Sequence, residues 1–142
     1  MSDSNIVKNQ SLFRGFTPEQ IRQVTSCMVH AAYGPGEDVI VEGQSHNRVW
    51  IILEGRVAAV RMGIILSEFK EGDTFGELEL LDQKPTVATI KALSNTKILS
   101  LSYDDLMKIR QDDLPIYAGL IENLAINLCG RLRYMGMRVA DR

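Results

Sequence analysis

The hydrophobic pattern divides the chain into three parts, of which the first is helical. Apolar residues recur at Ile21, Val24 and Met28, three and four positions apart, and polar residues fill most positions between them. This spacing places one apolar stripe on a helix. The segment Thr17–Gln20 (TPEQ) precedes it with a capping residue, a proline suited to the first helical position and a glutamine that completes a capping box. We predict a helical N-terminal part over residues 1–30.

Between residues 31 and 101 the chain changes to short β-branched runs separated by glycines. The glycines from Gly36 to Gly72 are about 7–12 residues apart. The predicted strands lie at Val39–Val41, Val49–Leu53, Val57–Val60, Ile64–Leu66, Val87–Ile90 and Lys97–Leu101. Short strands at even spacing are typical of an antiparallel barrel or jelly roll, and no segment is long enough for the helical crossover of a parallel sheet. The pattern predicts a mainly β fold with flanking helices, a double-stranded β-helix (jelly-roll β-roll).

Residues 102–142 return to a helical pattern. Ser102 can cap a short helix that ends near Arg110, and Pro115 then opens a long helix of about 25 residues. An apolar stripe follows the long helix at steps of three and four: Tyr117, Ile121, Leu124, Leu128, Leu132, Met135 and Val139. This spacing is close to that of a coiled-coil seam, so we predict that the stripe forms a homodimer interface. Packing of the same stripe on the β-roll of its own chain is the alternative.

The composition describes one ordinary domain. A chain of 142 residues suffices for one hydrophobic core. The net charge of −2, from 16 Lys+Arg and 18 Asp+Glu, gives no general attraction to nucleic acid or to an acidic membrane. The charge is unevenly distributed, because the residues from Arg131 onward carry four arginines against one acid, Asp141. Such a basic tail complements the dipole of a helix C-terminus, and it could also contact an acidic partner or a ligand phosphate.

Histidines and cysteines are too few and too far apart to predict a metal site. We expect His30 to end the first helix, His46 to be solvated, and Cys27 and Cys129 to be buried thiols on apolar helical stretches. Two cysteines form no disulfide framework and the N-terminus has no basic and apolar leader, so we expect a reduced, cytoplasmic protein. No apolar run reaches the roughly 18 residues of a membrane span.

Two segments resemble the phosphate-binding cassette of the cyclic-nucleotide-binding domain superfamily, which includes the catabolite activator proteins and the regulatory subunits of cyclic-AMP-dependent kinase. They are Phe75–Leu81 (FGELELL) and Lys84–Ala92 (KPTVATIKA), which place the cassette at residues 74–92. Other segments that resemble the superfamily are Leu12–Thr17, Gly34–Ile40, Glu42–Gln44 and Val49–Val57. The resemblance covers nearly the whole chain and implies one domain over residues 1–142.

The resemblance implies a ligand site at the cassette. In the family, the glutamate at the position of Glu77 accepts a hydrogen bond from the ribose 2′-hydroxyl, and Gly76 begins a one-turn helix whose free N–H groups attract an anion. The family's arginine that pairs with the cyclic phosphate is replaced here by Thr86. The expected ligand-binding residues are Phe75, Gly76, Glu77, Leu78, Pro85, Thr86 and Val87.

The resemblance also implies a function. We expect a stand-alone, non-enzymatic regulatory module that senses a small ligand and signals through an unidentified effector protein. Cyclic AMP or cyclic GMP is the implied ligand, with weak or absent binding because Thr86 carries no charge. A different small ligand, and a structural dimerisation or docking adaptor with an empty site, are the alternatives.

Two further classes of function are not expected. The chain ends at Arg142 without a helix-turn-helix segment, so we expect no direct DNA binding. An enzyme of the cupin type needs several histidines around a metal, and the sequence has two histidines, neither in a strand pattern.

Overall fold

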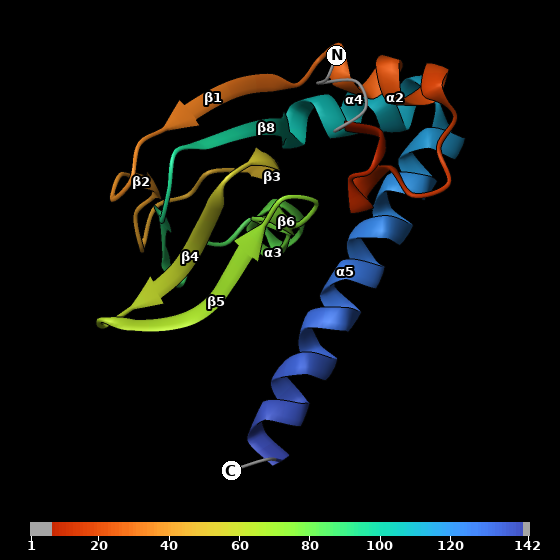
Figure 1. The fold of residues 1–142 in the computed structure, drawn as a ribbon. Coiled ribbons are helices and arrows are strands. Elements are labelled where there is room, and N and C mark those ends of the chain that lie inside the picture. Colours follow the sequence, from red (N-terminus) through yellow and green to blue (C-terminus); the bar gives the residue numbers. More distant parts are fainter. Residues whose placement is uncertain (1–6, 141–142) are drawn as a thin grey trace.

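Two four-stranded antiparallel sheets form the β-roll, and helices cover an outer face (Figure 1). The structure is a computed structural model that describes the backbone of residues 7–140 and the side chains of residues 7–137. One sheet has the order β1 (Val29–Tyr33), β8 (Thr96–Ser102), β3 (Arg48–Glu54) and β6 (Thr74–Phe75). The other has the order β2 (Asp38–Ile40), β7 (Thr89–Ala92), β4 (Arg56–Arg61) and β5 (Ile64–Lys70). The predicted mainly β jelly roll with a short N-terminal and a long C-terminal helix is confirmed.

The helical N-terminal part ends earlier than predicted. Helix α2 (Pro18–Thr25) has the expected capping box, in which the Gln20 amide donates to Thr17 Oγ1 at 3.2 Å and the Thr17 amide donates to Gln20 Oε1 at 2.9 Å. The chain then turns, and β1 begins at Val29. The expectation that His30 ends a helix is wrong, because His30 lies in β1 and pairs with Leu99 of β8.

Strand β7 begins at Thr89, two residues later than predicted. The hydroxyl of Thr86 donates to the carbonyl oxygen of Ala88 at 3.0 Å, so these residues form a turn instead of a strand. Val87 lies within this turn and is 58% exposed.

The helices after the β-roll begin where capping residues place them. Helix α4 (Tyr103–Asp112) starts after Ser102, whose hydroxyl accepts a hydrogen bond from the Asp105 amide at 3.1 Å. Helix α5 (Leu114–Ala140) follows directly and is 27 residues long. Figure 1 shows α5 leaving the helical layer and running past α3 (Glu77–Asp82) and β5.

The central strand β3 is buried on both faces. Val49, Ile51 and Leu53 belong to a core shared with the helices, whereas Trp50 and Ile52 belong to a core between the two sheets. Because successive side chains of a strand point to opposite faces, a run of buried residues requires cover on both sides. The unbroken apolar run in β3 therefore reflects a β-roll with a helical layer on its outer face.

The first half of α5 is fixed to the helical layer. Leu120 and Leu124 are buried in the core shared with the helices. The Asn123 side chain donates to the carbonyl oxygens of Leu12 and Arg14 at 2.7 and 3.0 Å, which ties α5 to the short helix η1 (Ser11–Phe13) and the residue after it. Among the described side chains of the second half of α5 none is such a buried anchor in this layer, and Leu132, Tyr134 and Met137 are exposed.

The two thiols lie in different surroundings. Cys27 is half-buried and donates to the Val24 carbonyl oxygen, and its burial, together with the nearby Asp105 carboxylate, raises the pKa of the thiol. Cys129 lies on α5 and is exposed, so the expectation of a buried thiol there is wrong.

Two properties of the described residues bear on the classes of function considered above. None of the helices described is both long enough and apolar enough to cross a membrane. Within residues 7–137, no three or more His, Cys, Asp or Glu side chains gather where they could hold a metal ion.

Candidate functional site

The predicted cassette folds into a turn and a one-turn helix between β6 and the loop before β7. Gly76 joins β6 to α3 with a φ of 90°. A Cβ atom at this position would lie 2.7 Å from the Trp50 ring and 2.8 Å from the Arg48 carbonyl oxygen. The glycine is therefore required for close packing of α3 on β3, in addition to its left-handed backbone.

Glu77, the first residue of α3, is completely buried and is held by helix α5. Its carboxylate accepts a hydrogen bond from the Thr74 hydroxyl and forms an ion pair with Arg131, whose Nη1 lies 2.8 Å from Glu77 Oε1. The Arg131 Nη2 donates to the Thr74 carbonyl oxygen at 3.0 Å, and the guanidinium lies 4.9 Å from the centre of the Phe69 ring. Arg131 is 54 residues from Glu77 in sequence, and the sequence marked it only as the start of the basic tail, not as a residue of the cassette site.

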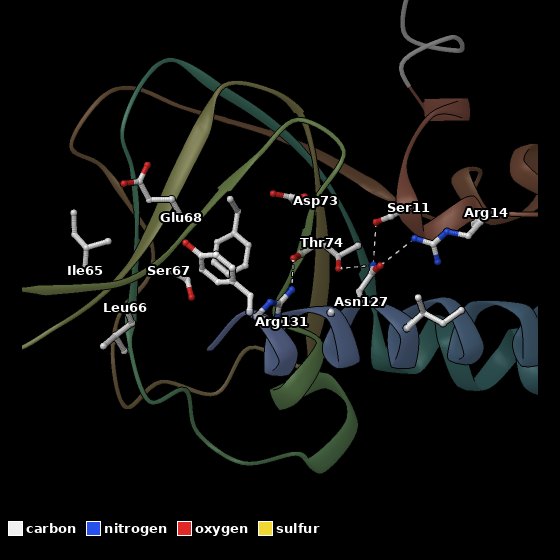
Figure 2. Close-up of a pocket in the computed structure, with 14 residues that line it drawn as sticks. Ser11, Arg14, Ile65, Leu66, Ser67, Glu68, Asp73, Thr74, Asn127 and Arg131 are labelled. Carbon is white, nitrogen blue, oxygen red and sulfur yellow. Dashed lines mark hydrogen bonds between the residues drawn. The ribbon is translucent and has the colours of Figure 1, made fainter. Parts of the chain in front are cut away.

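A second residue of α5 continues this network. Asn127, one helical turn before Arg131, donates to the Thr74 hydroxyl at 3.0 Å and to the Ser11 hydroxyl at 2.9 Å. Figure 2 shows Asn127 and Arg131 pointing from α5 toward Thr74. The Thr74 hydroxyl thus accepts from Asn127 and donates to Glu77, so that three hydrogen-bonding side chains connect α5 to the start of α3.

Thr86 occupies the position expected for the phosphate-binding arginine, and its polar atoms are engaged within the chain. Besides the bond from its hydroxyl to Ala88, its amide donates to the Gln44 carbonyl oxygen and its carbonyl oxygen accepts from the Gly43 amide, both at 2.9 Å. The residue is 6% exposed. It carries no charge that could pair with a phosphate.

His46 lies beneath the cassette, so the expectation that it is solvated is wrong. The Arg48 amide donates to His46 Nδ1 at 3.0 Å, which assigns the ring proton to Nε2. Nε2 then donates to Glu79 Oε1 at 3.1 Å, and the ring packs edge-on against Trp50. Glu79 is therefore bound to an imidazole, whereas Glu77 is bound to Arg131.

A cavity of about 380 Å³ lies between the cassette, β5 and α5. Six of the seven predicted ligand-binding residues line it, and Pro85 does not: the six are Phe75, Gly76, Glu77, Leu78, Thr86 and Val87. The residues that sequence reasoning missed come mainly from β5 and α5: Ile65, Leu66, Ser67, Phe69 and Arg131. The structure thus brings the cassette together with two elements that no motif indicated.

A larger groove of about 890 Å³ adjoins this cavity (Figure 2). It runs between β5 and α5, and Ser11 and Arg14 lie at one end of it. Arg131 and Phe69 line both spaces. The Arg131 side chain therefore stands where the cavity opens into the groove.

The model of the cyclic nucleotide-binding domain family matches residues 31–113, which is more than half of the chain. The chain belongs to the cyclic nucleotide-binding domain family. Domains of this family are regulatory ligand-binding modules. The expected resemblance to catabolite activators and kinase regulatory subunits is confirmed.

Relatives of this cyclic nucleotide-binding domain occur in kinases and in receptor proteins. It is 34% identical over 94 residues to human cGMP-dependent protein kinase 2, a match that covers 66% of the chain and 12% of the kinase. It is 28% identical over 132 residues to the cyclic AMP receptor protein of Thermus thermophilus, covering 89% of the chain and 59% of the receptor. The chain therefore spans only part of the curated relatives that it matches.

Solved structures share the fold. A cyclic nucleotide-binding domain from Methylobacillus flagellatus superposes with a TM-score of 0.88 at 23% identity, covering 99% of this chain and 82% of that one. The catabolite activator protein of Thermus thermophilus superposes with a TM-score of 0.77 at 26% identity, covering 92% of this chain and 62% of that one.

The stripe predicted for dimerisation divides into two halves in this domain. Leu124 is buried inside the chain, and Tyr117 and Ile121 pack against the same core, so these three side chains serve the intramolecular layer. Leu128 is half-buried, whereas Leu132 and Met135 are 68% and 50% exposed. The side chain of Val139 lies outside the described residues. The exposed part of the stripe is thus confined to the second half of α5.

Replacing Arg131 with glutamine should lower the free energy of unfolding by about 3 kcal/mol, because it leaves the buried Glu77 carboxylate without a cation. Glu77→Gln combined with Arg131→Gln should cost less than the sum of the two single changes, since the double variant buries no charge. Urea unfolding gives the free energy of unfolding of the two single variants and of the double variant.

Arg133→Gln, an exposed change on the same helix, is the matched control and should alter stability by less than about 0.5 kcal/mol. If Arg131→Gln behaved like this control, the ion pair would not stabilise the fold.

Proposed function

We propose that this domain is a non-enzymatic, ligand-sensing regulatory module in which occupancy of the cavity sets the position of the second half of α5. The observation that carries this proposal is the ion pair between Glu77 and Arg131. Glu77 lies at the cavity wall and is completely buried, and its cationic partner comes from α5. Cavity and helix therefore share one interaction.

The coupling follows from competition for that interaction. The first half of α5 is fixed by buried side chains and by Asn123, whereas Leu132, Tyr134 and Met137 in its second half are exposed. A ligand that bonds to Glu77 displaces Arg131 and releases the second half of α5. A ligand that leaves the ion pair intact and contacts Met135 holds this half in place. Either ligand shifts a two-state equilibrium through its differential contacts.

Cyclic nucleotides are expected to bind this site weakly. An arginine–phosphate pair is bidentate, and each charge-assisted bond contributes about 1.5–3 kcal/mol. Loss of one or two such bonds corresponds to about a 10- to 1000-fold loss of affinity or more. Thr86 offers one hydroxyl, which already donates to Ala88.

We expect Thr86→Arg to raise the affinity for cyclic AMP by about 10- to 1000-fold, because it restores the charged partner of the phosphate. Isothermal titration calorimetry with cyclic AMP and cyclic GMP measures the change. Thr86→Gln, which has a long polar side chain without a charge, is the control and should gain little. Low-micromolar binding by the unaltered protein, or an equal gain by the two variants, would contradict the proposed role of Thr86.

A structural adaptor that dimerises through α5 is the second candidate function. It is supported by the exposed apolar side chains of the stripe in the second half of this helix, Leu132 and Met135. Large exposed apolar residues that gather on one helix are typical of an interaction surface. In this alternative the cavity is empty and the homodimer docks an effector protein.

Leu132→Lys should convert a homodimer into a monomer, because it places a charge within the predicted apolar seam. Size-exclusion chromatography with light scattering gives the mass in solution. Met137→Lys is the control, because Met137 is exposed on the same helix but lies off the stripe, and it should leave the mass of the dimer unchanged. A monomeric mass for the unaltered protein would contradict the predicted homodimer.

A further inference from the structure

The wall of the cavity is predominantly apolar. Five parts of the chain contribute aliphatic, aromatic or thioether side chains to it: β4, β5, the cassette, the start of β7, and α5. The apolar lining residues are Ala59, Ile64, Ile65, Leu66, Phe69, Phe75, Leu78, Val87, Ala88, Ile90 and Met135. A volume of about 380 Å³ lies within the range of small-molecule sites, which are typically apolar with a few polar groups.

The charged groups of the wall are already paired with each other or with a neighbour. Glu77 is bound by Arg131 and Thr74, and Glu79 accepts from His46. Arg131 is bound on three sides, by Glu77, the Thr74 carbonyl oxygen and the Phe69 ring. Thr86 donates to Ala88. Each charged lining side chain described here therefore already has a partner within the protein.

The balance of charge in the wall is unfavourable to an anion. Two carboxylates, Glu77 and Glu79, face one guanidinium, Arg131. An anionic ligand would have to share Arg131 with Glu77 or displace it, and displacement leaves the buried Glu77 without its cation. Burying an unpaired charge is costly, whereas burying an apolar group is favourable. An uncharged ligand avoids this cost and gains from every apolar contact.

We propose that the cavity takes an uncharged, largely apolar small molecule, and that this ligand leaves the Glu77–Arg131 pair intact. The proposal rests on the sensing function proposed above and names the class of its ligand. Such a molecule contacts β5 on one side and Met135 of α5 on the other, so its binding holds the second half of α5 against the β-roll. We therefore expect ligand binding to stabilise the position of α5 in which its second half lies against the β-roll.

A pair of fluorescent probes with the same aromatic body tests the ligand class. N-phenyl-1-naphthylamine is uncharged, and 1-anilinonaphthalene-8-sulfonate adds one sulfonate. We expect saturable binding of the uncharged probe at one site per chain, at least about tenfold tighter than the sulfonate, because the sulfonate finds no free cation. Fluorescence titration of the full chain gives both dissociation constants.

Three variants test whether the uncharged probe binds in the cavity. Ala59→Phe fills the space and should abolish binding of the uncharged probe, with circular dichroism confirming the fold. Thr86→Arg adds a cation to the wall and should narrow or reverse the preference, without filling the site with an apolar group. Met62→Ser removes an apolar residue that is 88% exposed and does not line the cavity, and it should leave both affinities unchanged.

The outcomes separate the ligand class from the sensing function. Sulfonate binding as tight as that of the uncharged probe, no saturable binding of the uncharged probe, or its survival in Ala59→Phe would overturn the ligand class. Hydrogen exchange of amides 126–137 is measured in the same samples. If the uncharged probe binds but exchange in this segment is unchanged, the sensing function fails while the ligand class stands. If cyclic AMP alone binds and changes exchange there, sensing stands and the ligand class fails.

Discussion

The Glu77 carboxylate is completely buried, and its cation comes from a helix 54 residues away in sequence. A carboxylate in such a place must be neutralised, paired or hydrogen-bonded. Here Arg131 pairs with it while Thr74 donates to it, and Asn127 bonds to Thr74 from the previous helical turn. The ion pair is thus where the cassette, strand β6 and helix α5 meet, and we propose that the position of the exposed half of α5 depends on it.

This constraint acts on a helix that is held unequally along its length. The first half of α5 belongs to the core shared with η1, α2 and α4, and Asn123 bonds two backbone carbonyl groups there. The second half meets the β-roll through Asn127, Arg131 and the wall of the cavity. A helix that is fixed at one end and held at the other by a ligand site can report on that site. Thr86 at the position of the cassette arginine leaves this connection to the helix in place, and we propose that it changes which ligand can act through the connection.

Local signals predicted much of the fold because local physics decides those features. The capping box at Thr17, the cap at Ser102, the glycine-separated strands and the break before α5 appear as expected. Strand β1 (VHAAY) was missed because it is short and has little β-branched character, and it is held by pairing with β8, 67 residues further along at Ala31 and Ile98. Its register depends on tertiary contacts that no window of sequence contains.

The candidate site was predictable only in part, for the same reason. The cassette motif identified Gly76, Glu77 and Thr86, all of which line the cavity. Arg131 and His46 become site residues through long-range bonds, to Glu77 and Glu79, that leave no periodic signal.

The most direct test of the coupling is a distance measurement between the end of the β4–β5 turn and α5. Spin labels are placed on Cys129 and on the new cysteine of a Met62→Cys variant, in a Cys27→Ser background, and pulsed electron resonance gives the distribution of distances between them. A narrow distribution that broadens and shifts in Glu77→Gln is the expected result, and an unchanged distribution would contradict the account.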